Sequence, residues 1–241
     1  MKNEERPQHQ VTARSRTVAT TVLMVATFMD LMDSTITNVA LPTIGKDLNA
    51  TPEQLEWTLA GYVIAFATLL ITGGRLGDIF GHRRIFVIGM VGFTLASLGA
   101  ALSQTGDLLV ATRVIQGAFA GIMVPQVLSS VQVMFAPEER APVLGIIGAL
   151  SSLGAIGGLI LGGWLVTADL LGMGWRSIFL VNVPVGVVLV AAALLFVPRS
   201  RSEHPLRPDL VGVLLGGLGV FLVVFPLTDG RAAGWAWWIW A

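Results

Sequence analysis

The sequence predicts an all-α, polytopic membrane protein: a six-helix transmembrane bundle followed by a seventh helix and the start of an eighth. Three observations predict this class. Of the 241 residues, 54% are hydrophobic and 12% are charged, whereas soluble domains carry about 25% charged residues. The chain also holds 28 glycines, which permit close helix packing in lipid. Long apolar stretches recur along the chain, separated by short polar loops.

The apolar stretches give the individual elements. A membrane span needs roughly 20 apolar residues, because a helix rises about 1.5 Å per residue across an apolar slab of about 30 Å. The predicted spans are 18–40, 55–76, 85–102, 108–134, 143–167, 177–197 and 210–227. The chain then divides into a tail (1–17), a six-helix bundle (18–197), a linker (198–209), a seventh helix (210–228), and an outer loop with the start of an eighth helix (229–241).

The basic residues predict the orientation, since cytoplasmic loops carry an excess of Lys and Arg. With a cytoplasmic N-terminus, most of the 15 Lys and Arg residues fall inside. The outer loops then hold only Lys46, Arg176 and Arg231, and Arg113 lies within a span. We therefore expect a multi-pass protein of the cytoplasmic membrane with the tail 1–17 inside the cell.

Composition and motifs argue against several functions. The chain has no cysteine, and its 15 basic and 15 acidic residues balance, so neither a disulfide-stapled fold nor a nucleic-acid partner is expected. His9, His82 and His204 fall outside the predicted spans, and no zinc-protease, serine-nucleophile or phosphate-loop motif occurs. We expect no enzyme activity, metal or cofactor, and an ion gradient as the energy source.

Two acidic residues lie inside the first span, where a charged side chain costs about 2.5–3.5 kcal/mol. Asp33 lies three residues after Asp30 and four residues before Thr37, so these three side chains share one helix face. Two carboxylates this close in a low dielectric should not both ionise easily. A carboxyl that exchanges a proton beside a cavity would suit a proton-coupled carrier or a cation site. The alternative is that one Asp lies near the outer interface or caps a neighbouring helix.

Arg113, in the fourth span, is the second exception, because it stays charged at any cellular pH. It must pair with an acid, bind carbonyls or face water. Gln116, Gly117, Ala120 and Gly121 continue one face at helical spacing, which would let another helix approach closely. The alternative is that Arg113 extends to the outer headgroups.

Glycines and polar residues mark three further sites. Between spans two and three, Gly74 and Gly81 permit a tight turn beside Asp78 and Arg83, which could also be a simple positive anchor. In the fifth span a glycine recurs every four residues, as expected of a tight interface or of a surface on which helices slide. These glycines are Gly154, Gly158 and Gly162. At the sixth span, Trp175 and Arg176 suit the membrane interface, while Asn182 and Pro184 should loosen the helix.

Taken together, these residues resemble the major facilitator superfamily, and within it the fourteen-helix drug:proton antiporter branch. The loop from Gly74 through Asp78 to Arg83 is similar to the superfamily's signature between helices two and three. Arg113, Gln116 and Gly117 resemble its fourth-helix signature. The first-helix signature is matched by Asp33, Thr35, Asn38, Ala40, Leu41 and Pro42, and the sixth-helix entry by Trp175, Arg176, Phe179, Asn182, Pro184 and Gly186. One departure is Leu159, which stands where the branch carries a proline.

The resemblance implies an exporter that exchanges hydrophobic or cationic compounds for protons, with Asp33, Asp30 and Arg113 coupling the two. It implies that Asp78 and Arg83 latch a cytoplasmic gate. It also implies two bundles, so this chain is expected to be the N-terminal portion of a longer carrier whose C-terminal half is its partner. The alternatives are a metabolite facilitator or symporter of the same superfamily, or a truncated membrane scaffold that does not transport.

Overall fold

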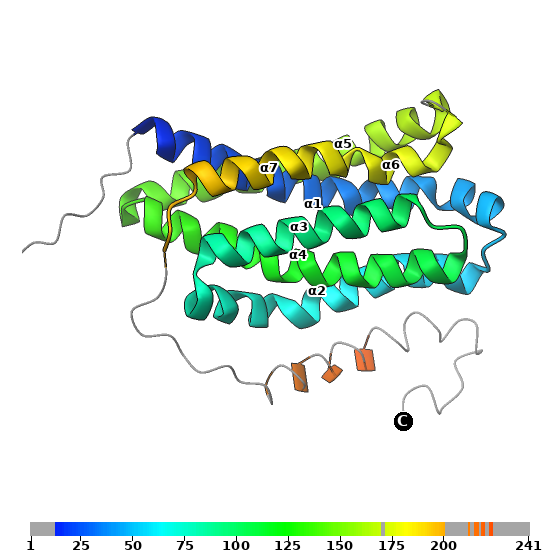
Figure 1. Cartoon of the computed structure of the whole chain (residues 1–241), viewed down its shortest axis with the longest axis horizontal. Helices are drawn as coiled ribbons and strands as arrows, with labels where there is room; N and C mark the ends of the chain where they lie inside the picture. The colour runs from blue at the N-terminus through cyan, green and yellow to red at the C-terminus, as the bar shows by residue number, and fades with distance from the viewer. Residues whose placement is uncertain are drawn as a thin grey trace, which may run out of the picture.

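A computed structural model describes residues 13–169 and 172–200, together with residues 212, 215, 216, 218, 219, 222 and 223. Six of its helical segments are long and apolar enough to cross a membrane, and each covers one of the first six predicted spans (Figure 1). They are α1 (Ala13–Leu48), α2 (Pro52–Phe80), α3 (His82–Ala101), α4 (Gly106–Met134), α5 (Pro137–Ala168) and the segment Gly174–Phe196. The predicted all-α polytopic class is confirmed.

The sixth segment is not one continuous helix. It consists of the 3-10 turn η2 (Gly174–Arg176), the short α6 (Ser177–Leu180) and α7 (Asn182–Phe196). The interruption falls at Val181, three residues before Pro184. A proline has no N–H to donate to the carbonyl four residues earlier, so the ladder is weakened at this point. The irregular stretch brings Asn182 to the start of α7.

The predicted tail 1–17, linker 198–209 and terminal segment 229–241 fall wholly or largely outside the described residues. Of the predicted seventh helix, 210–228, the structure describes only the separate residues given above, all of them helical. That division of the chain stays a prediction.

All six segments start before the predicted spans, and α1, α2 and α5 also end after them, because apolar length alone does not record the polar turns that continue a helix past the lipid. Helix α1 has 36 residues, about 54 Å at 1.5 Å per residue, against an apolar slab of about 30 Å. At the start of α2, Thr51 and Gln54 form a reciprocal capping box. The turn from α2 to α3 passes through Gly81 at φ 96°, a conformation that favours glycine.

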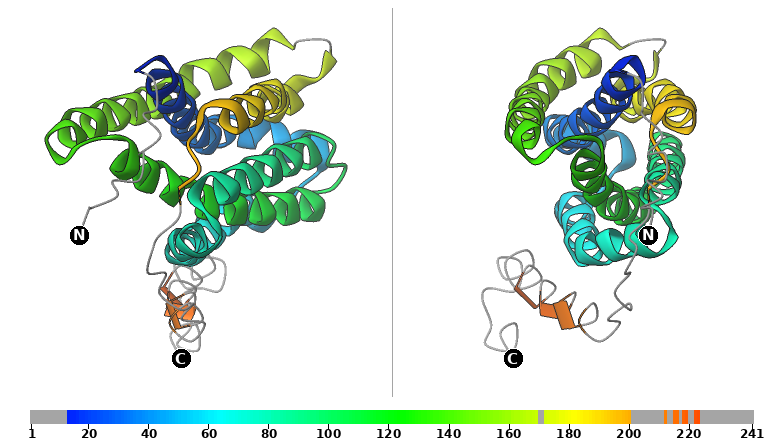
Figure 2. Two further views of the ribbon diagram at one scale, coloured as in Figure 1. Left: turned by 60° about the vertical axis from the view of Figure 1, so that its left-hand side comes forward. Right: turned by 90° about the vertical axis from the view of Figure 1, so that its left-hand side faces the viewer.

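The helices run side by side along the long axis of the bundle, with α5 and α2 on opposite sides (Figures 1 and 2). Helix α1 packs mainly against α5 and α7, and α4 packs mainly against α2 and α3. Contacts between α3 and α7 and between α1 and α4 join the two groups. As a result, α1 and α4 lie next to each other inside the bundle and carry the charged side chains that the sequence singled out.

The glycine stripe of α5 lies against α1. A methyl group at Gly154 would come within 2.8 Å of the Phe28 carbonyl oxygen, and one at Gly158 within 2.8 Å of the Met32 carbonyl oxygen. A methyl group at Gly162 would come within 2.8 Å of Ile36. The glycine stripe of α5 therefore forms a close interface with α1, the helix that carries both buried aspartates.

Two apolar clusters fill the interior of the bundle. One is built around Leu23, Phe86 and Met123, and the other around Ile44, Leu109 and Trp175. Along α1, Met29 belongs to the first cluster and Ile36 to the second. The polar side chains of the candidate site lie between the two clusters. Along the helix axis they therefore have apolar packing on both sides.

The α1–α5 interface gives a testable prediction with a matched control. Gly158→Val should lower the unfolding stability by about 1–3 kcal/mol, because the added side chain overpacks a backbone contact. Gly163→Val makes the same chemical change on the same helix, but nothing lies within 4 Å of its added Cβ. Thermal unfolding in detergent compares the two variants, and equal losses of stability would contradict the interface described here.

Candidate functional site

The candidate site is centred on the carboxylate of Asp33, in the middle of α1. Arg113 Nη1 of α4 donates to Asp33 Oδ2 at 2.5 Å. On the other oxygen, Oδ1, Gln116 Nε2 donates at 3.0 Å and Asn182 Nδ2 at 2.6 Å. Asp33 is 0% exposed and Arg113 is 1% exposed. The two charges form a buried ion pair whose carboxylate also accepts two neutral hydrogen bonds.

Arg113 is held by contacts from several helices. Its Nε donates to the Thr58 carbonyl oxygen of α2 at 3.4 Å, and its Nη1 also donates to Gln116 Oε1 at 2.7 Å. The guanidinium carbon lies 4.2 Å from the centre of the Tyr62 ring and 5.7 Å from that of Phe179. Such cation–π contacts stabilise a desolvated guanidinium. Arg113 therefore points into the bundle and not toward headgroups.

Asp30 lies one helical turn before Asp33 and is 5% exposed. Within the described part of the chain, its one hydrogen bond to another side chain comes from the Tyr62 hydroxyl, which donates to Asp30 Oδ1 at 2.5 Å. The two aspartates thus have different surroundings: Asp33 accepts from a cation and two amides, and Asp30 accepts from one neutral hydroxyl. Tyr62 connects them, because its ring also covers Arg113.

Polar contacts extend from Asp33 into α3 and α7. Gln116 Nε2 donates to Ser97 Oγ at 2.7 Å, and Asn182 Nδ2 lies 3.3 Å from the same oxygen. The Asn182 Oδ1 atom is buried and has no hydrogen-bond partner in the ranges that the structure describes. An unpartnered buried acceptor is costly, so this is the point of the network that a water molecule or a protonated group would satisfy.

At the α2–α3 turn, Asp78 and Arg83 bind different partners. Asp78 lies 3.5 Å from His82 Nε2, and Arg83 Nη1 donates to the Leu194 carbonyl oxygen of α7 at 3.1 Å. The structure therefore does not bring Asp78 and Arg83 together. His82, which the sequence placed outside the spans, is the first residue of α3 and is buried against Gln126, with Nδ1 and Oε1 3.0 Å apart.

The glycines of the loop and fourth-helix signatures mark close helix contacts. A Cβ atom at Gly77 would meet Gln126 and His82, and one at Gly117 would come within 2.9 Å of the Tyr62 backbone. Gly74 is less crowded, since its nearest neighbour is Pro125 at 3.8 Å. These contacts hold α2 against α4 and place Thr58 and Tyr62 beside Arg113.

At the opposite end of the bundle, the sixth-helix entry is tied to α1. Trp175 Nε1 donates to Asp47 Oδ2 at 2.9 Å, and Arg176 Nη1 donates to the same oxygen at 2.6 Å. Arg176 also reaches the Ser103 carbonyl oxygen. Pro184 lies on the exposed side of α7. These contacts anchor the irregular segment that carries Asn182 into the site.

Sequence reasoning missed Tyr62, Ser97, Thr58 and Asp47. Tyr62 is the single tyrosine of the chain, and Ser97 is a polar residue inside an apolar span; both signals were available but neither names a partner. In residues 13–169 and 172–200, no three His, Asp or Glu side chains lie together as metal ligands. Within those residues the site consists of the Asp33–Arg113 ion pair and the side chains that hydrogen-bond to it.

A bundle of membrane-length helices with a buried, paired acid and base is typical of membrane transport proteins. The sequence profile of the Major Facilitator Superfamily matches residues 23–241. The chain belongs to this superfamily.

Curated relatives extend the comparison. The chain is 44% identical over 225 residues to the probable actinorhodin transporter of Streptomyces coelicolor, covering 92% of this chain and 39% of that protein. It is 37% identical to the tetracenomycin C resistance and export protein of Streptomyces glaucescens, covering 90% and 39%. A multidrug resistance protein B homolog of Mycobacterium tuberculosis is also 37% identical, covering 88% and 39%. The chain spans about two fifths of the length of these relatives.

Solved structures share the fold. A bacterial homolog of the human lysosomal transporter Spinster, in an inward-facing and occupied conformation, superposes with a TM-score of 0.67 at 19% identity, covering 90% of this chain and 53% of that one. The proton:xylose symporter XylE superposes with a TM-score of 0.69 at 16% identity, covering 92% and 55%. At these identities the likeness concerns the fold.

The ion pair predicts a specific pattern of stability. Arg113→Met should destabilise the protein by about 3–5 kcal/mol, because it leaves the Asp33 carboxylate buried without a counter-charge. Adding Asp33→Asn should recover part of that loss. A double-mutant cycle by thermal unfolding in detergent measures the coupling, and strictly additive losses would contradict the pairing.

Proposed function

We propose that this chain is the N-terminal part of a proton-coupled exporter of small hydrophobic or cationic compounds in the cytoplasmic membrane. The observation that carries the proposal is the buried cluster of Asp30, Asp33 and Arg113 between two apolar clusters. Ionisable groups are costly at this depth and are typical of ion and proton pathways. The names of two relatives, a probable actinorhodin transporter and a tetracenomycin C resistance and export protein, support the export of small compounds.

The different surroundings of the aspartates suggest how a proton would act. Asp33 accepts from a guanidinium and two amides, a set of donors that stabilises a carboxylate. Asp30 accepts from one neutral hydroxyl, so it is the carboxyl that can take up a proton without breaking the ion pair. Protonation of Asp33, in contrast, would release Arg113. A cationic substrate would compete with Arg113 for the same carboxylate.

In this scheme Asp33 is the coupling carboxyl, which alternately holds a proton, and so releases Arg113, and stabilises a cation. Asp30 shares the proton-holding role while the ion pair stays closed. Arg113 would bias that exchange, because its charge favours the carboxylate while the pair is closed. Both side chains are shielded from solvent in the structure. Proton exchange therefore requires a rearrangement that lets water reach the pair, as alternating access between two repeats would provide.

We also propose that the outer faces of α2 and α5 meet the C-terminal half of the carrier. In the most apolar stretch of each of these helices, 17% of residues are buried, compared with 61% in α3. Exposed apolar side chains on these faces include Val63, Ile71, Ile156 and Ile160. The relatives are long enough to supply a second bundle, since the chain covers 39% of their length.

We assign the bundle end that carries the α2–α3 turn to the cytoplasm. Arg83, Arg84, Arg140 and Arg199 all lie on the turns and helix ends of this side, whereas the opposite end holds Lys46 and Arg176 among the described residues. This distribution follows the positive-inside rule. The tail that precedes α1 would then also be cytoplasmic, and Asp78 and Arg83 would act at a gate on this side.

A metabolite facilitator or symporter is the second candidate, and Leu159 favours it. Leu159 replaces the proline of the antiporter signature, and α5 runs through this position without interruption. Addition of a cationic dye to energised inverted vesicles distinguishes the candidates: an antiporter releases protons from the vesicles on dye addition, whereas a facilitator moves dye without a proton signal.

The proposal predicts that Asp33→Asn abolishes proton-driven dye uptake into inverted vesicles containing the complete carrier, because the amide can neither hold an exchangeable proton nor pair with Arg113. Dye fluorescence measures uptake, and immunoblotting measures expression. Asp107→Asn is the matched control: Asp107 lies on the exposed first turn of α4 and contacts Gln54, so transport should persist. Full transport by Asp33→Asn would contradict the proposal.

A further inference from the structure

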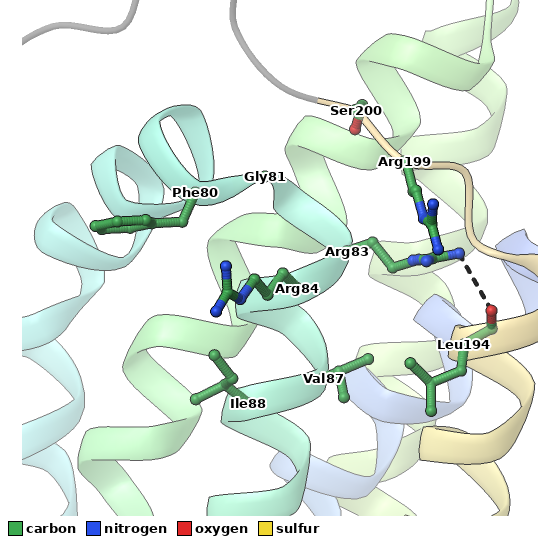
Figure 3. A pocket seen from close by; sticks show the side chains of 9 residues that line it. All are labelled: Phe80, Gly81, Arg83, Arg84, Val87, Ile88, Leu194, Arg199 and Ser200. Carbon is green, nitrogen blue, oxygen red and sulfur yellow. Dashed lines mark hydrogen bonds between the residues drawn. The ribbon is translucent and has the colours of Figure 1, made fainter.

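A cavity of about 610 Å³ lies beside the α2–α3 turn, where the ends of α2, α3 and α7 meet (Figure 3). It is lined by Arg83, Arg84 and Arg199 and by the apolar side chains of Phe80, Val87, Ile88 and Leu194. In Figure 3, Val87, Ile88 and Leu194 lie below the arginines, and Phe80 lies above Arg84. The cavity is separate from the buried ion pair, since it shares no residue with the polar contacts of Asp33.

The three arginines are not matched by acidic groups. None of them makes an ion pair with a carboxylate of the described residues. Arg83 donates to the carbonyl oxygens of Leu194 and Val197, which are neutral acceptors. In Figure 3 the Arg199 side chain points toward that of Arg83, and Arg84 lies between Phe80 and Ile88. Like charges this close repel each other, so an anion between them would stabilise the arrangement.

Two further features favour an anion here. Arg83 and Arg84 stand in the first turn of α3, which has no side-chain cap, and a helix N-terminus attracts negative charge. Ser200, whose backbone carbonyl accepts from His82 N, also lines the cavity, and its buried hydroxyl has no hydrogen-bond partner among the described residues. The cavity therefore offers guanidinium donors and a hydroxyl that no described group binds.

The lower part of the cavity continues as an apolar surface. Arg84, Ile88, Val91 and Leu95 follow one face of α3 at helical spacing, and the last three are exposed. On α7, which packs beside α3, Leu194 is also exposed. A cationic pocket directly above an exposed apolar strip matches an amphiphile with an anionic head and a hydrocarbon tail.

We propose that this cavity binds the headgroup of an anionic phospholipid. Its phosphate would lie among Arg83, Arg84 and Arg199, and an acyl chain would follow the exposed side chains of α3. Basic pockets between helices at the cytoplasmic face of a membrane are suited to such headgroups. The proposal goes beyond the transport function and does not depend on proton coupling.

Native mass spectrometry of the complete carrier in detergent tests the proposal, with dioleoylphosphatidylglycerol, dioleoylphosphatidylcholine and inorganic phosphate as probes. Wild type should retain phosphatidylglycerol in preference to phosphatidylcholine. The double variant Arg84→Gln, Arg199→Gln should bind phosphatidylglycerol roughly 30-fold more weakly, because each basic residue near an anionic headgroup contributes about fivefold. Neither arginine makes a hydrogen bond within the described chain, so the fold should persist.

Two further variants complete the test. Arg140→Gln removes one positive charge at the same end of the bundle, but Arg140 binds the Gln132 and Phe135 carbonyl oxygens outside the cavity, so lipid retention should not change. Ile88→Trp should weaken phosphatidylglycerol binding and leave any phosphate binding unchanged, because the larger side chain fills only the apolar part of the cavity.

Equal retention of both lipids, or equal effects of the double variant and Arg140→Gln, would overturn the proposal. Displacement of the lipid by phosphate, with no effect of Ile88→Trp, would assign the site to free phosphate instead.

Discussion

The structure depends on one electrostatic constraint: a carboxylate and a guanidinium that lie inside an apolar bundle must remain paired. Asp33 and Arg113 meet at 2.5 Å with almost no exposed surface. Removing either charge leaves the other desolvated without compensation, which is far more costly than losing a surface ion pair. The neighbouring side chains satisfy the pair's remaining hydrogen bonds, and the two apolar clusters keep water from it.

Helix packing serves the same constraint. Glycines on α5 bring its backbone against α1, and Gly117 on α4 lets the backbone of α2 approach at Tyr62. A larger residue at these positions would move α1 or α2 and change the distances to Asp33 and Arg113. The interruption at Val181 has a related role, because it places Asn182 where its amide reaches Asp33. Close packing thus keeps the donors in place around the carboxylate.

Much of this arrangement could be predicted from the sequence, and the reason is energetic. Asp30, Asp33 and Arg113 are costly in lipid, so their positions alone marked them as functional candidates. The glycine period of α5 indicated either a tight interface or a surface on which helices slide, but not the partner helix, which is α1. Hydropathy and periodicity describe single helices. They do not say which faces of two helices meet. The sequence therefore could not predict three contacts: that of Asp78 with His82, that of Arg83 with α7, and the hydrogen bond from the Asn182 amide to Asp33. Tyr62 and Ser97 were missed for the same reason.

We propose that the sealed ion pair becomes accessible to water during the working cycle of the carrier. Ser97 lies in the network, contacting Gln116 and Asn182, and the chain has no native cysteine, so Ser97→Cys places one small thiol at the site. Labelling the complete carrier with a membrane-impermeant thiol reagent, from each side in turn and with or without a proton gradient, measures that access. The account predicts labelling from one side under one condition and its loss or reversal under the other. No labelling from either side under any condition would contradict it.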